Sequence, residues 1–447
     1  MASELENPIG EVEFSALMEP LGPFEPKPEI AVGFSGGVDS TALLHLAARW
    51  TRRRGGKIFA LTVDHGLRAE SLAEAKLVQR RVKALGVTGS ILRWEDHKPV
   101  SGIQNAAREA RYELMTRWCR RMGILHLLLG HHQEDQAETL LHRLGRQTGA
   151  DGLAGMARLR ETNHVRLLRP CLGIAKKRLR AVTKSCNLDW VEDPSNQNLD
   201  YARVRLRKLL PSLEAEQISS AALAGTARRL ASVRKTLEHQ TVQVLAAATE
   251  LSSFGYARIR FEALSNVEPE IAHRILDRLL GAIGGHFYPI RHQRLVNLLR
   301  DIQQTKLAAS RTLAGCIILP HNGDILVVRE AGRCEEQKIN LGSWEDWDGR
   351  YQIRITGPEI PKQQIFFIRP LGNNLGRNKF EKNPKNAFIG LNPAVRRALP
   401  SIWDHRGLVC VPHLGYGRTE RNTASVIDAQ VEFLPKRPAT NAFFSVV

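Results

Sequence analysis

The sequence predicts an α/β fold in which a doubly wound parallel sheet is followed by a mainly helical region and a smaller β-containing region. Short apolar runs alternate with longer helical patterns over the first part of the chain, which is the spacing of βαβ units. A glycine-rich turn joins the first apolar run to the first helical pattern. Because ligands bind such sheets at the carboxyl ends of the strands, we expect the functional site there.

The predicted strands and helices follow one another in a regular order. Four short apolar runs predict strands at residues 30–34, 58–63, 90–94 and 124–129. Helical periodicity predicts helices at 41–53, 69–85 and 104–122, and a basic helix at 176–186. Residues 1–28 contain five prolines and are expected to form an irregular arm before the first strand.

Changes of pattern predict three domains after this arm. An α/β domain is predicted over residues 29–211, and Pro211 is expected to close it. Apolar residues at helical spacing predict a mainly helical domain over 212–305. An α+β region is predicted over 306–447, with short β-like runs at residues 316–319, 325–328 and 365–368.

The composition is that of a globular protein with an excess of positive charge. The 447 residues are 43% hydrophobic and can build two to four domains. The formal net charge of +18 favours a polyanionic partner such as a nucleic acid. No run approaches the roughly 20 apolar residues of a membrane-spanning helix, and the N-terminus is acidic and lacks the pattern of a signal peptide. We therefore expect a cytoplasmic protein with no membrane partner.

The glycine-rich turn carries the strongest functional signal. Its sequence is Ser35-Gly36-Gly37-Val38-Asp39-Ser40, followed by Thr41, and it lies between a predicted strand and a predicted helix. Two glycines allow a tight turn, and the helix amides and the hydroxyl groups can then hold phosphate. Asp39 would repel phosphate unless a cation lay between them, so we predict that it binds Mg²⁺. The alternative is a turn that only links strand to helix.

Polar clusters follow the second and fourth predicted strands. The second strand leads into Asp64 and His65, and the fourth leads into the segment 131–141. Asp135 and Glu138 are three residues apart on one helix face, where they could hold a cationic group or simply complement the helix dipole. His132 is expected to be a polar contact near the phosphates. A zinc site at His131, His132 and Asp135 is the alternative that the spacing supports less well.

A third cluster precedes the fourth strand. Residues 104–112 contain Arg108 and Arg111, and a guanidinium is always charged and suits a phosphate or a developing anion. Solvated pairing of these arginines with glutamate is the alternative reading. Further arginines are dense at residues 203–208 and recur through the mainly helical region.

These motifs resemble those of the PP-loop, or N-type, ATP pyrophosphatases, whose fold is Rossmann-like, and in particular the tRNA(Ile)-lysidine synthetase family. The resemblance covers residues 30–210 closely and extends less specifically to 395–416. It includes the phosphate loop and the segments 63–68, 107–112, 131–141, 149–156 and 193–196. One departure is Val204, which stands where the family commonly has asparagine between two arginines.

The resemblance implies a ligase that joins L-lysine to C2 of the wobble cytidine in the CAU anticodon of tRNA(Ile), with ATP adenylating that cytidine first. It implies catalytic roles for Asp39, Arg111, Asp135 and Glu138, with the last two binding lysine. The ATP site would comprise Ser35, Gly36, Gly37, Val38, Asp39, Ser40, Thr41, Asp64, His65 and His132, with Mg²⁺ on Asp39. The tRNA would contact Arg203, Arg205, Arg207, Arg228, Arg229 and Arg291.

Two other functions use related features. A sulfur-inserting tRNA enzyme or an amidotransferase-coupled synthetase would share the phosphate loop, but the six cysteines are scattered with no Cys-x-x-Cys pair, and no glutamine-hydrolysing domain is recognisable. A basic RNA-binding protein with an inactive ATP fold is the alternative from another class. The oligomeric state is left open, with a homodimer among the expectations.

Overall fold

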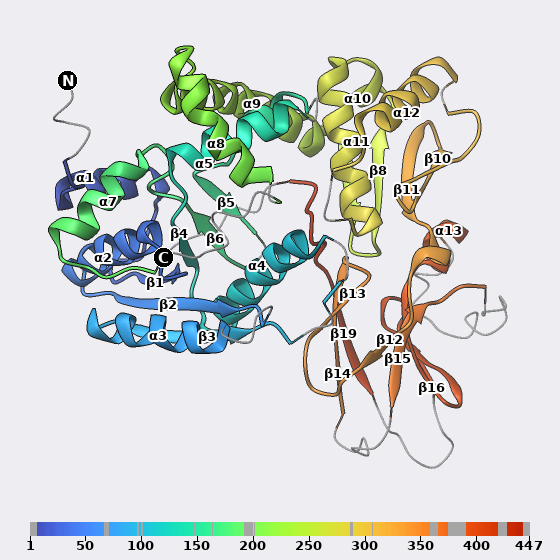
Figure 1. Ribbon diagram of the computed structural model, residues 1–447. Coiled ribbons are helices and arrows are strands. Elements are labelled where there is room, and N and C mark those ends of the chain that lie inside the picture. The colour runs from blue at the N-terminus through green and yellow to red at the C-terminus, as the bar shows by residue number, and fades with distance from the viewer. Residues whose placement is uncertain are drawn as a thin grey trace. The chain divides into compact units, whose positions relative to one another are not determined.

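The computed structural model places six strands of the first half of the chain in one sheet (Figure 1). The structure describes residues 7–66, 71–95, 98–99, 102–145, 148–162, 164–191, 200, 202–286, 289–305, 307–357, 365–373, 390–418 and 427–440. The chain divides into two compact units, the first formed by Met1–Thr236 and the second by Leu237–Asn441. The domain boundaries predicted near residues 211 and 305 stay predictions.

The first sheet confirms the predicted doubly wound arrangement. Its order is β3 (Thr88–Arg93), β2 (Lys57–Asp64), β1 (Glu29–Gly33), β4 (His126–Leu129), β6 (Arg166–Leu168) and β5 (Leu159–Glu161). All neighbouring pairs are parallel except β5 with β6. The strand order reverses between β1 and β4, which is the switch point where ligands bind in such sheets.

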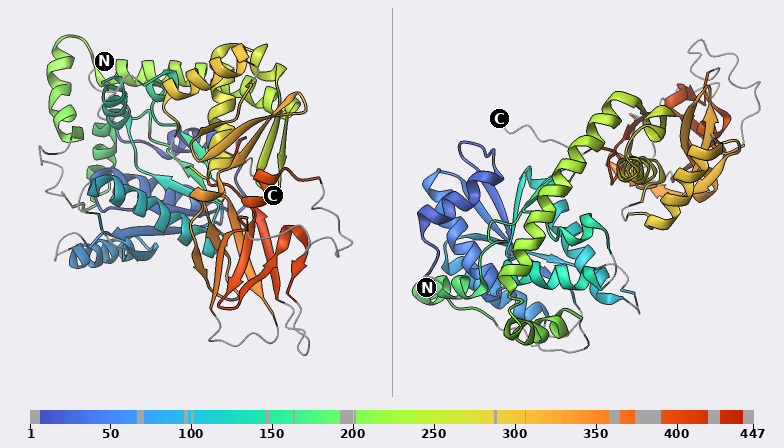
Figure 2. Two further views of the ribbon diagram at one scale, coloured as in Figure 1. Left: turned by 90° about the vertical axis from the view of Figure 1, so that its right-hand side faces the viewer. Right: turned by 90° about the horizontal axis from the view of Figure 1, so that it is seen from above.

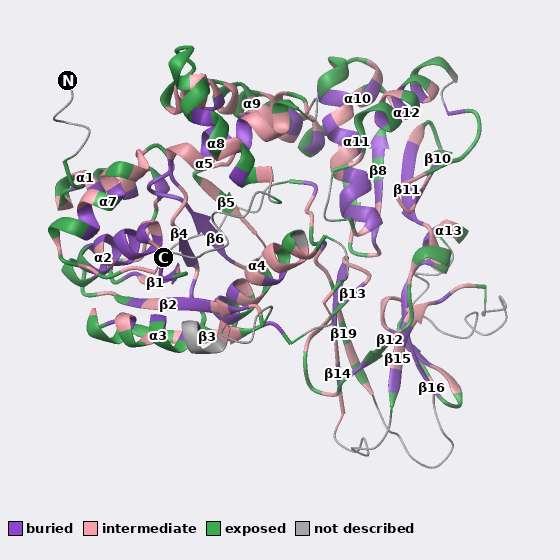
Figure 3. Ribbon diagram, in the orientation of Figure 1, coloured by how far each residue is buried: buried purple, intermediate pink, exposed green. Residues whose placement is uncertain are grey.

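Helices cover both faces of this sheet, as Figures 1 and 2 show. Alternate residues of β1 point to opposite faces, so Ile30 and Val32 join one apolar cluster and Ala31 joins the other. Figure 3 shows the buried residues concentrated on these central strands and on α2. The helices of this unit are α2 (Val38–Arg53), α3 (Ser71–Ala84), α4 (Ile103–Met122), α5 (Gln133–Leu144), α6 (Ala150–Leu153), α7 (Lys176–Ser185) and α8 (Ala202–Ala215), and α9 (Ser220–Ala248) continues into the second unit.

The N-terminal arm is not irregular, which corrects the expectation from its prolines. Residues Glu11–Met18 form α1, and Glu19–Leu21 form the short helix η2. Phe14, Met18 and Leu21 are at most 1% exposed, because their helical spacing turns all three toward the core beside α2. Pro211 likewise lies inside α8, which continues to Ala215.

The second unit combines helices with antiparallel sheets. Its helices are α10 (Glu262–Ser265), α11 (Pro269–Gly284), α12 (His292–Thr305) and α13 (Pro393–Arg397), with short helices η4 (Ala331–Arg333) and η6 (Pro412–Leu414). One sheet has the order β7 (Thr249–Ser252), β8 (Tyr256–Arg260), β11 (Asp324–Arg329), β10 (Cys316–His321), β9 (Arg311–Leu313). Helices α11 and α12 share one apolar cluster with this sheet.

Two further sheets follow in the same unit. One has the order β12 (Gln337–Ile339), β15 (Phe366–Pro370), β16 (Pro400–Asp404), β17 (Gly407–Val411), β18 (Tyr416–Gly417). The other has the order β13 (Glu345–Trp347), β14 (Tyr351–Thr356), β19 (Asp428–Phe433). The three predicted β-like runs therefore coincide with β10, β11 and β15. None of the helices described in either unit has the length and apolar character needed to cross a bilayer.

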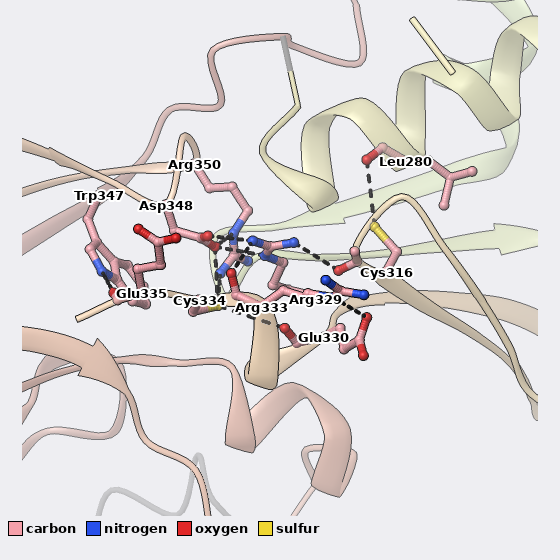
Figure 4. Close-up of polar contacts among 11 residues, drawn as sticks. Leu280, Cys316, Arg329, Glu330, Arg333, Cys334, Glu335, Trp347, Asp348 and Arg350 are labelled. Carbon is pink, nitrogen blue, oxygen red and sulfur yellow. Dashed lines mark hydrogen bonds and ion pairs between the residues drawn. The ribbon is translucent and has the colours of Figure 1, made fainter. Parts of the chain in front are cut away.

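A buried ion cluster joins the strands of two sheets in the second unit (Figure 4). Asp348 lies in the turn between β13 and β14, with its side chain 5% exposed. Its carboxylate accepts hydrogen bonds from Arg329 of β11 at 2.6 and 2.9 Å and from Arg350 at 2.6 Å. The Cys334 thiol donates to the same carboxylate at 3.3 Å. Burial opposes ionisation, but the two guanidinium groups hold the pKa of Asp348 below its ordinary value.

We predict that Asp348→Asn lowers the free energy of unfolding of the second unit by about 3 kcal/mol, because two buried guanidinium groups lose their counter-ion. Asparagine tolerates the positive φ of this position, 53°, so the change removes charge without adding backbone strain. Urea unfolding followed by tryptophan fluorescence measures the effect. Asp346→Asn, two residues away and exposed, is the matched control and should change stability by less than about 0.5 kcal/mol.

The effect should also depend on pH. Because the folded-state pKa of Asp348 is depressed, its contribution is present above the ordinary value of 3.8 and is lost as the pH falls through the lower folded-state value. The difference between wild type and Asp348→Asn should therefore shrink in acid. A difference that matched the Asp346→Asn control, or that stayed constant down to low pH, would contradict this account.

Candidate active site at the carboxyl edge of the first sheet

The glycine-rich turn joins β1 to α2 and has the shape expected of a phosphate loop. Gly36 has a φ of +79°, and a Cβ on this residue would lie 2.6 Å from Val78 Cγ2, so both backbone and packing require glycine. Gly37 caps α2 with an extended backbone, and the helix begins at Val38. The first N–H groups of an α-helix have no intrahelical partners and attract an anion.

Hydroxyl groups lie beside this helix start. The Ser40 hydroxyl donates to the Gly37 carbonyl at 3.0 Å, and the Ser35 and Ser40 hydroxyl oxygens are 3.2 Å apart. The Thr41 hydroxyl is buried and has no hydrogen-bond partner among the described residues. The seven residues predicted to hold phosphate, Ser35 to Thr41, are thus gathered at one helix end.

Asp39 lies in the first turn of α2 and faces two cations. His132 Nε2 is 3.5 Å and Lys176 Nζ is 3.6 Å from Asp39 Oδ2. Burial would raise the pKa of Asp39, but the hydrogen bond and charge of His132, helped by Lys176, hold it below its ordinary value. Asp39 Oδ1 is buried and has no hydrogen-bond partner in the described part of the chain. An ionised carboxylate with one unengaged oxygen fits a hard cation such as Mg²⁺.

The His132 ring contacts three carboxylates. It caps α5 and is 2% exposed. Its Nδ1 lies 3.0 Å from Glu134 Oε2, and its Nε2 lies 3.6 Å from Asp135 Oδ2 in addition to the contact with Asp39. Burial favours the neutral ring, but the hydrogen bonds to Asp39 and Glu134 and the charge of Asp135 raise the pKa of His132 to about 10. The ring is therefore an imidazolium at neutral pH.

The neighbouring His131 differs from His132 in that its pKa is lowered and its ring is neutral. Its Nδ1 accepts a hydrogen bond from Arg169 Nε at 3.2 Å, and burial lowers its pKa to about 3. His131 Nδ1 and both ring nitrogens of His132 have partners, which leaves these atoms unsuited to the alternative zinc site at His131, His132 and Asp135. The described residues also contain no group of three or more histidines, cysteines or acidic residues that could hold a metal.

Asp135 and Glu138 both lie on α5, but in different surroundings. Asp135 Oδ2 accepts the backbone N–H of His132 at 3.1 Å and so completes the helix cap. Glu138 is 1% exposed, and Arg207 of α8 donates to its two oxygens at 2.8 and 3.4 Å. Burial raises the pKa of Glu138 although Arg207 opposes the shift. Glu138, one of the two residues predicted to bind lysine, is therefore already paired with the Arg207 cation.

Asp64 is the last residue of β2, and His65 follows it. Asp64 Oδ1 accepts the Gly66 N–H at 2.9 Å and the Ser71 hydroxyl at 2.7 Å, so this carboxylate links the end of β2 to the start of α3. His65 Nδ1 is buried without a partner among the described residues, and burial and the charge of Arg111 lower the pKa of His65. Leu67 and Arg68 of this motif, and the motif at 193–196, lie outside the described residues.

Arg111 lies on α4 and is half-buried. Burial lowers its pKa, and the charges of Arg108 and Arg203 lower it further. No ion pair joins Arg111 to an acidic side chain within the described ranges, although its guanidinium lies 6.0 Å from the centre of the Tyr112 ring. Among the described residues, Arg111 is therefore a cation without an acidic counter-ion.

The predicted tRNA contacts are mostly surface residues. Arg203, Arg205, Arg228, Arg229 and Arg291 are exposed, whereas Arg207 is partly buried through its pairing with Glu138. Val204 is 7% exposed, so the side chain at the position of the family asparagine packs inside.

Three residues of the site were not predicted from the sequence: Glu134, Arg169 and Lys176. Glu134 Oε2 accepts the backbone N–H of Lys176 at 3.0 Å, which ties the start of α7 to α5. A sequence signal did exist for two of them, since Glu134 lies within the 131–141 motif and Lys176 begins the predicted basic helix. Arg169 carries no such signal.

Comparisons with known proteins show which family this chain is similar to. Residues 7–213 match the family described as PP-loop domain. The chain is 33% identical over 402 residues to tRNA(Ile)-lysidine synthase of Wolbachia pipientis wMel, covering 89% of this chain and 91% of that protein. It is 35% identical over 391 residues to tRNA(Ile)-lysidine synthase of Ruegeria pomeroyi, covering 88% and 90%. Among solved structures, the U34-tRNA thiolase NcsA from Methanococcus maripaludis aligns with a TM-score of 0.42 and 16% identity, over 48% of this chain and 78% of that chain.

We predict a coupling energy of about 1–2 kcal/mol between Glu138 and Arg207, because replacing only one of them leaves a partly buried charge without its partner. Urea unfolding of wild type, Glu138→Gln, Arg207→Gln and the double variant measures it. The pair Glu113–Arg117 on α4 is the control, since both side chains are more than 60% exposed at a similar separation of 2.6 Å. Its coupling should stay below about 0.5 kcal/mol, and equal values for the two pairs would refute the prediction.

Proposed function

This chain belongs to the tRNA(Ile)-lysidine synthase family, and on that premise we propose how its carboxyl-edge site carries out the reaction. The protein is an ATP-using ligase that modifies tRNA(Ile). The observation that carries the proposed mechanism is the bridge from Asp39 through His132 to Asp135. It brings the phosphate loop and the α5 carboxylates to one place.

The proposed reaction has two steps. In the first, O2 of the wobble cytidine attacks the α-phosphorus of ATP, the bond to the β-phosphate breaks, and pyrophosphate leaves. In the second, the lysine ε-amine attacks C2 and loses a proton, and the C2–O2 bond breaks to release AMP. Adenylation is needed because the oxygen alone is a poor leaving group, whereas AMP is a stable one.

The loop residues Ser35 to Thr41 would bind the pyrophosphate part of ATP through amides and hydroxyl groups at the start of α2. Asp39 Oδ1 and the Thr41 hydroxyl are unpartnered among the described atoms and would hold Mg²⁺. Bound there, the ion would offset negative charge on the phosphates. Asp64 and His65, at the end of the neighbouring strand β2, and His132 complete the proposed ATP site.

Arg111 would stabilise the charge that develops during adenylation. This role is supported by the half-buried guanidinium of Arg111, which has no carboxylate partner in the described ranges. A cation that the protein had already neutralised would stabilise a developing anion less. Asp135 and Glu138 would bind the lysine ammonium. Glu138 can serve in this way only if Arg207 leaves it, so a lysine cation would replace a guanidinium at the same carboxylate.

Lysine must also lose a proton before its amine can attack. Carboxylates that bind an ammonium stabilise its protonated form, which slows the second step. Glu138 can accept the proton of the lysine ammonium, because burial raises the pKa of Glu138 and makes its carboxylate a stronger base. We assign acceptance of the proton to Glu138 for this reason.

The exposed arginines of α8 and α9 would grip tRNA(Ile) through phosphate contacts, with Arg291 contributing from the second unit. A cytoplasmic location and a homodimer remain predictions from the sequence. Four of the six cysteines, Cys119, Cys171, Cys316 and Cys410, are unsuited to sulfur transfer, because they are buried and burial raises the pKa of each thiol to about 12.

The purified protein, given ATP, Mg²⁺, labelled lysine and tRNA(Ile) with a CAU anticodon, should place one lysine on the wobble cytidine and release pyrophosphate in equal amount. A tRNA(Ile) whose wobble cytidine is replaced by uridine is the control and should take up none. Pyrophosphate release without lysine transfer would contradict lysine as the nucleophile. Absence of both, with tRNA binding intact, would favour an RNA-binding protein with an inactive ATP fold.

We predict that Asp135→Asn lowers lysine transfer at least 100-fold while adenylated tRNA still forms, since the amide keeps the size of the side chain and loses the charge that attracts an ammonium. Quenched-flow analysis of labelled ATP and labelled lysine separates the two steps. Glu95→Gln, in the same unit and outside the site, is the control and should behave as wild type. Loss of adenylation together with lysine transfer would instead assign Asp135 a structural role in the cap of α5.

A further inference from the structure

Lys176 is the first residue of α7, and its ammonium lies beside the phosphate loop. Its Nζ is 3.6 Å from Asp39 Oδ2, and its side chain is 36% exposed. This separation exceeds the about 2.7–3.2 Å of an ordinary N–H···O hydrogen bond, so the two groups pair mainly by charge. An ammonium has three N–H donors, and a ligand that arrives from solvent can therefore still bind to it.

The loop itself carries no cation. The seven residues from Ser35 to Thr41 include no lysine and no arginine. In phosphate loops that end in Gly-Lys-Ser/Thr, the lysine of the loop reaches the β- and γ-phosphates. His132 is a cation beside the loop, but both of its ring nitrogens already face carboxylates. Among the described residues, Lys176 is the other cation within 4 Å of Asp39.

The backbone of Lys176 is fixed between two helices of the site. The Lys176 N–H donates to Glu134 Oε2 at 3.0 Å. The Gln133 N–H donates to the Ile174 carbonyl at 2.9 Å, so two bonds join the start of α7 to the start of α5. Leu179 of α7 is fully buried in the apolar cluster that also contains the buried residues of α2. Only the flexible side chain of Lys176 has to move to contact a ligand at the loop.

Free amides of α2 lie within reach of the same ligand. The first hydrogen bond of α2 runs from the Thr41 N–H to the Gly37 carbonyl at 3.0 Å, so the amides of residues 38–40 have no partner within the helix. The Asp39 carboxylate that faces Lys176 is separated from the Asp39 amide only by the short aspartate side chain. A single phosphate group can therefore accept hydrogen bonds from these amides and from the ammonium together.

We infer that the Lys176 ammonium binds the phosphates of ATP that leave as pyrophosphate. The inference rests on the proposed function, which supplies ATP as the ligand. Attack on the α-phosphorus breaks its bond to the bridging oxygen, and the electron pair of that bond stays on the departing pyrophosphate. A cation at this group stabilises the charge that develops there. Mg²⁺ at Asp39 would repel the ammonium, which favours its transfer from the carboxylate to phosphate.

Binding of pyrophosphate and of AMP, both with Mg²⁺, supplies the first test. Lys176→Gln should weaken pyrophosphate binding about tenfold and leave AMP binding unchanged, because AMP lacks the phosphates that the ammonium contacts. Lys177→Gln removes the same charge from the exposed neighbour on α7 and is the matched control, which should bind both ligands as wild type does. Calorimetric titration measures the constants, and melting temperatures establish that each variant is folded.

A second test separates direct contact with phosphate from an effect through Asp39. If Lys176 only neutralises Asp39, replacing Lys176 should change nothing once Asp39→Asn has removed that charge. A direct ligand of phosphate should still cost about tenfold in pyrophosphate binding when Lys176→Gln is added to Asp39→Asn. The comparison is made without Mg²⁺, so loss of a metal ligand does not enter it.

The kinetic expectation concerns adenylation alone. At saturating ATP, Lys176→Gln should form adenylated tRNA roughly tenfold more slowly than wild type, because the charge on the leaving group is less well stabilised. Lysine transfer to tRNA that is already adenylated should keep the wild-type rate, since pyrophosphate has left by then. Quenched-flow measurements separate the two steps.

Four results would overturn the inference. Wild-type pyrophosphate binding by folded Lys176→Gln would exclude the contact, and an equal loss in Lys177→Gln would show a general effect of net charge. An equal loss of AMP binding would place the ammonium at the α-phosphate. A loss that disappears in the Asp39→Asn background would make Lys176 a positioning residue. Wild-type enzyme that binds pyrophosphate but incorporates no lysine would contradict the proposed function, and the pyrophosphate constants would still decide this inference.

Discussion

The buried positive charge of His132 holds together the edge of the first sheet on which the site depends. Asp39 comes from the start of α2, and Glu134 and Asp135 come from the first turn of α5. Without a cation between them these carboxylates would repel one another across the switch point of the sheet. The raised pKa of His132 means that their attraction outweighs the cost of burying a charged ring. Lys176 adds a second cation from α7 on the Asp39 side.

The same edge carries two electrostatic regions with different roles. The acidic region lies on α5 and around His132, while the basic region comprises Arg108 and Arg111 of α4 and Arg169 after β6. The proposed reaction brings two polyanions and one cation to a common point. Two separate regions of opposite charge can bind RNA and lysine at different places until adenylation has taken place. If the acidic and basic side chains were intermixed, they would pair with one another and bind the substrates less well. His131 and His132 lie where the regions meet, one neutral and one charged.

Much of the first unit could be predicted from the sequence, because its evidence is local. Apolar runs and helical spacing placed β1 to β4 and α2 to α4 within three residues of their observed bounds, and the motifs fell at strand ends as the parallel sheet requires. Helix α1 and its packing were not predicted, because the prolines on both sides of it favoured an irregular arm although its apolar residues have helical spacing. The pairing of Glu138 with Arg207 was missed because 69 residues separate them, and only the packing of α5 against α8 brings them together. The ion cluster at Asp348 depends in the same way on contacts between distant strands.

The pairing of Glu138 also sets a condition on how lysine can be bound. A carboxylate that is 1% exposed is costly to leave without a cation, so on the proposed roles Arg207 can depart only as the lysine ammonium arrives. The charge balance at Glu138 is then the same before and after the exchange. The displaced guanidinium needs a new anion, and α8 is the helix whose other arginines are exposed toward solvent. Phosphate groups of bound tRNA would supply that anion, which links lysine binding to tRNA binding through one side chain.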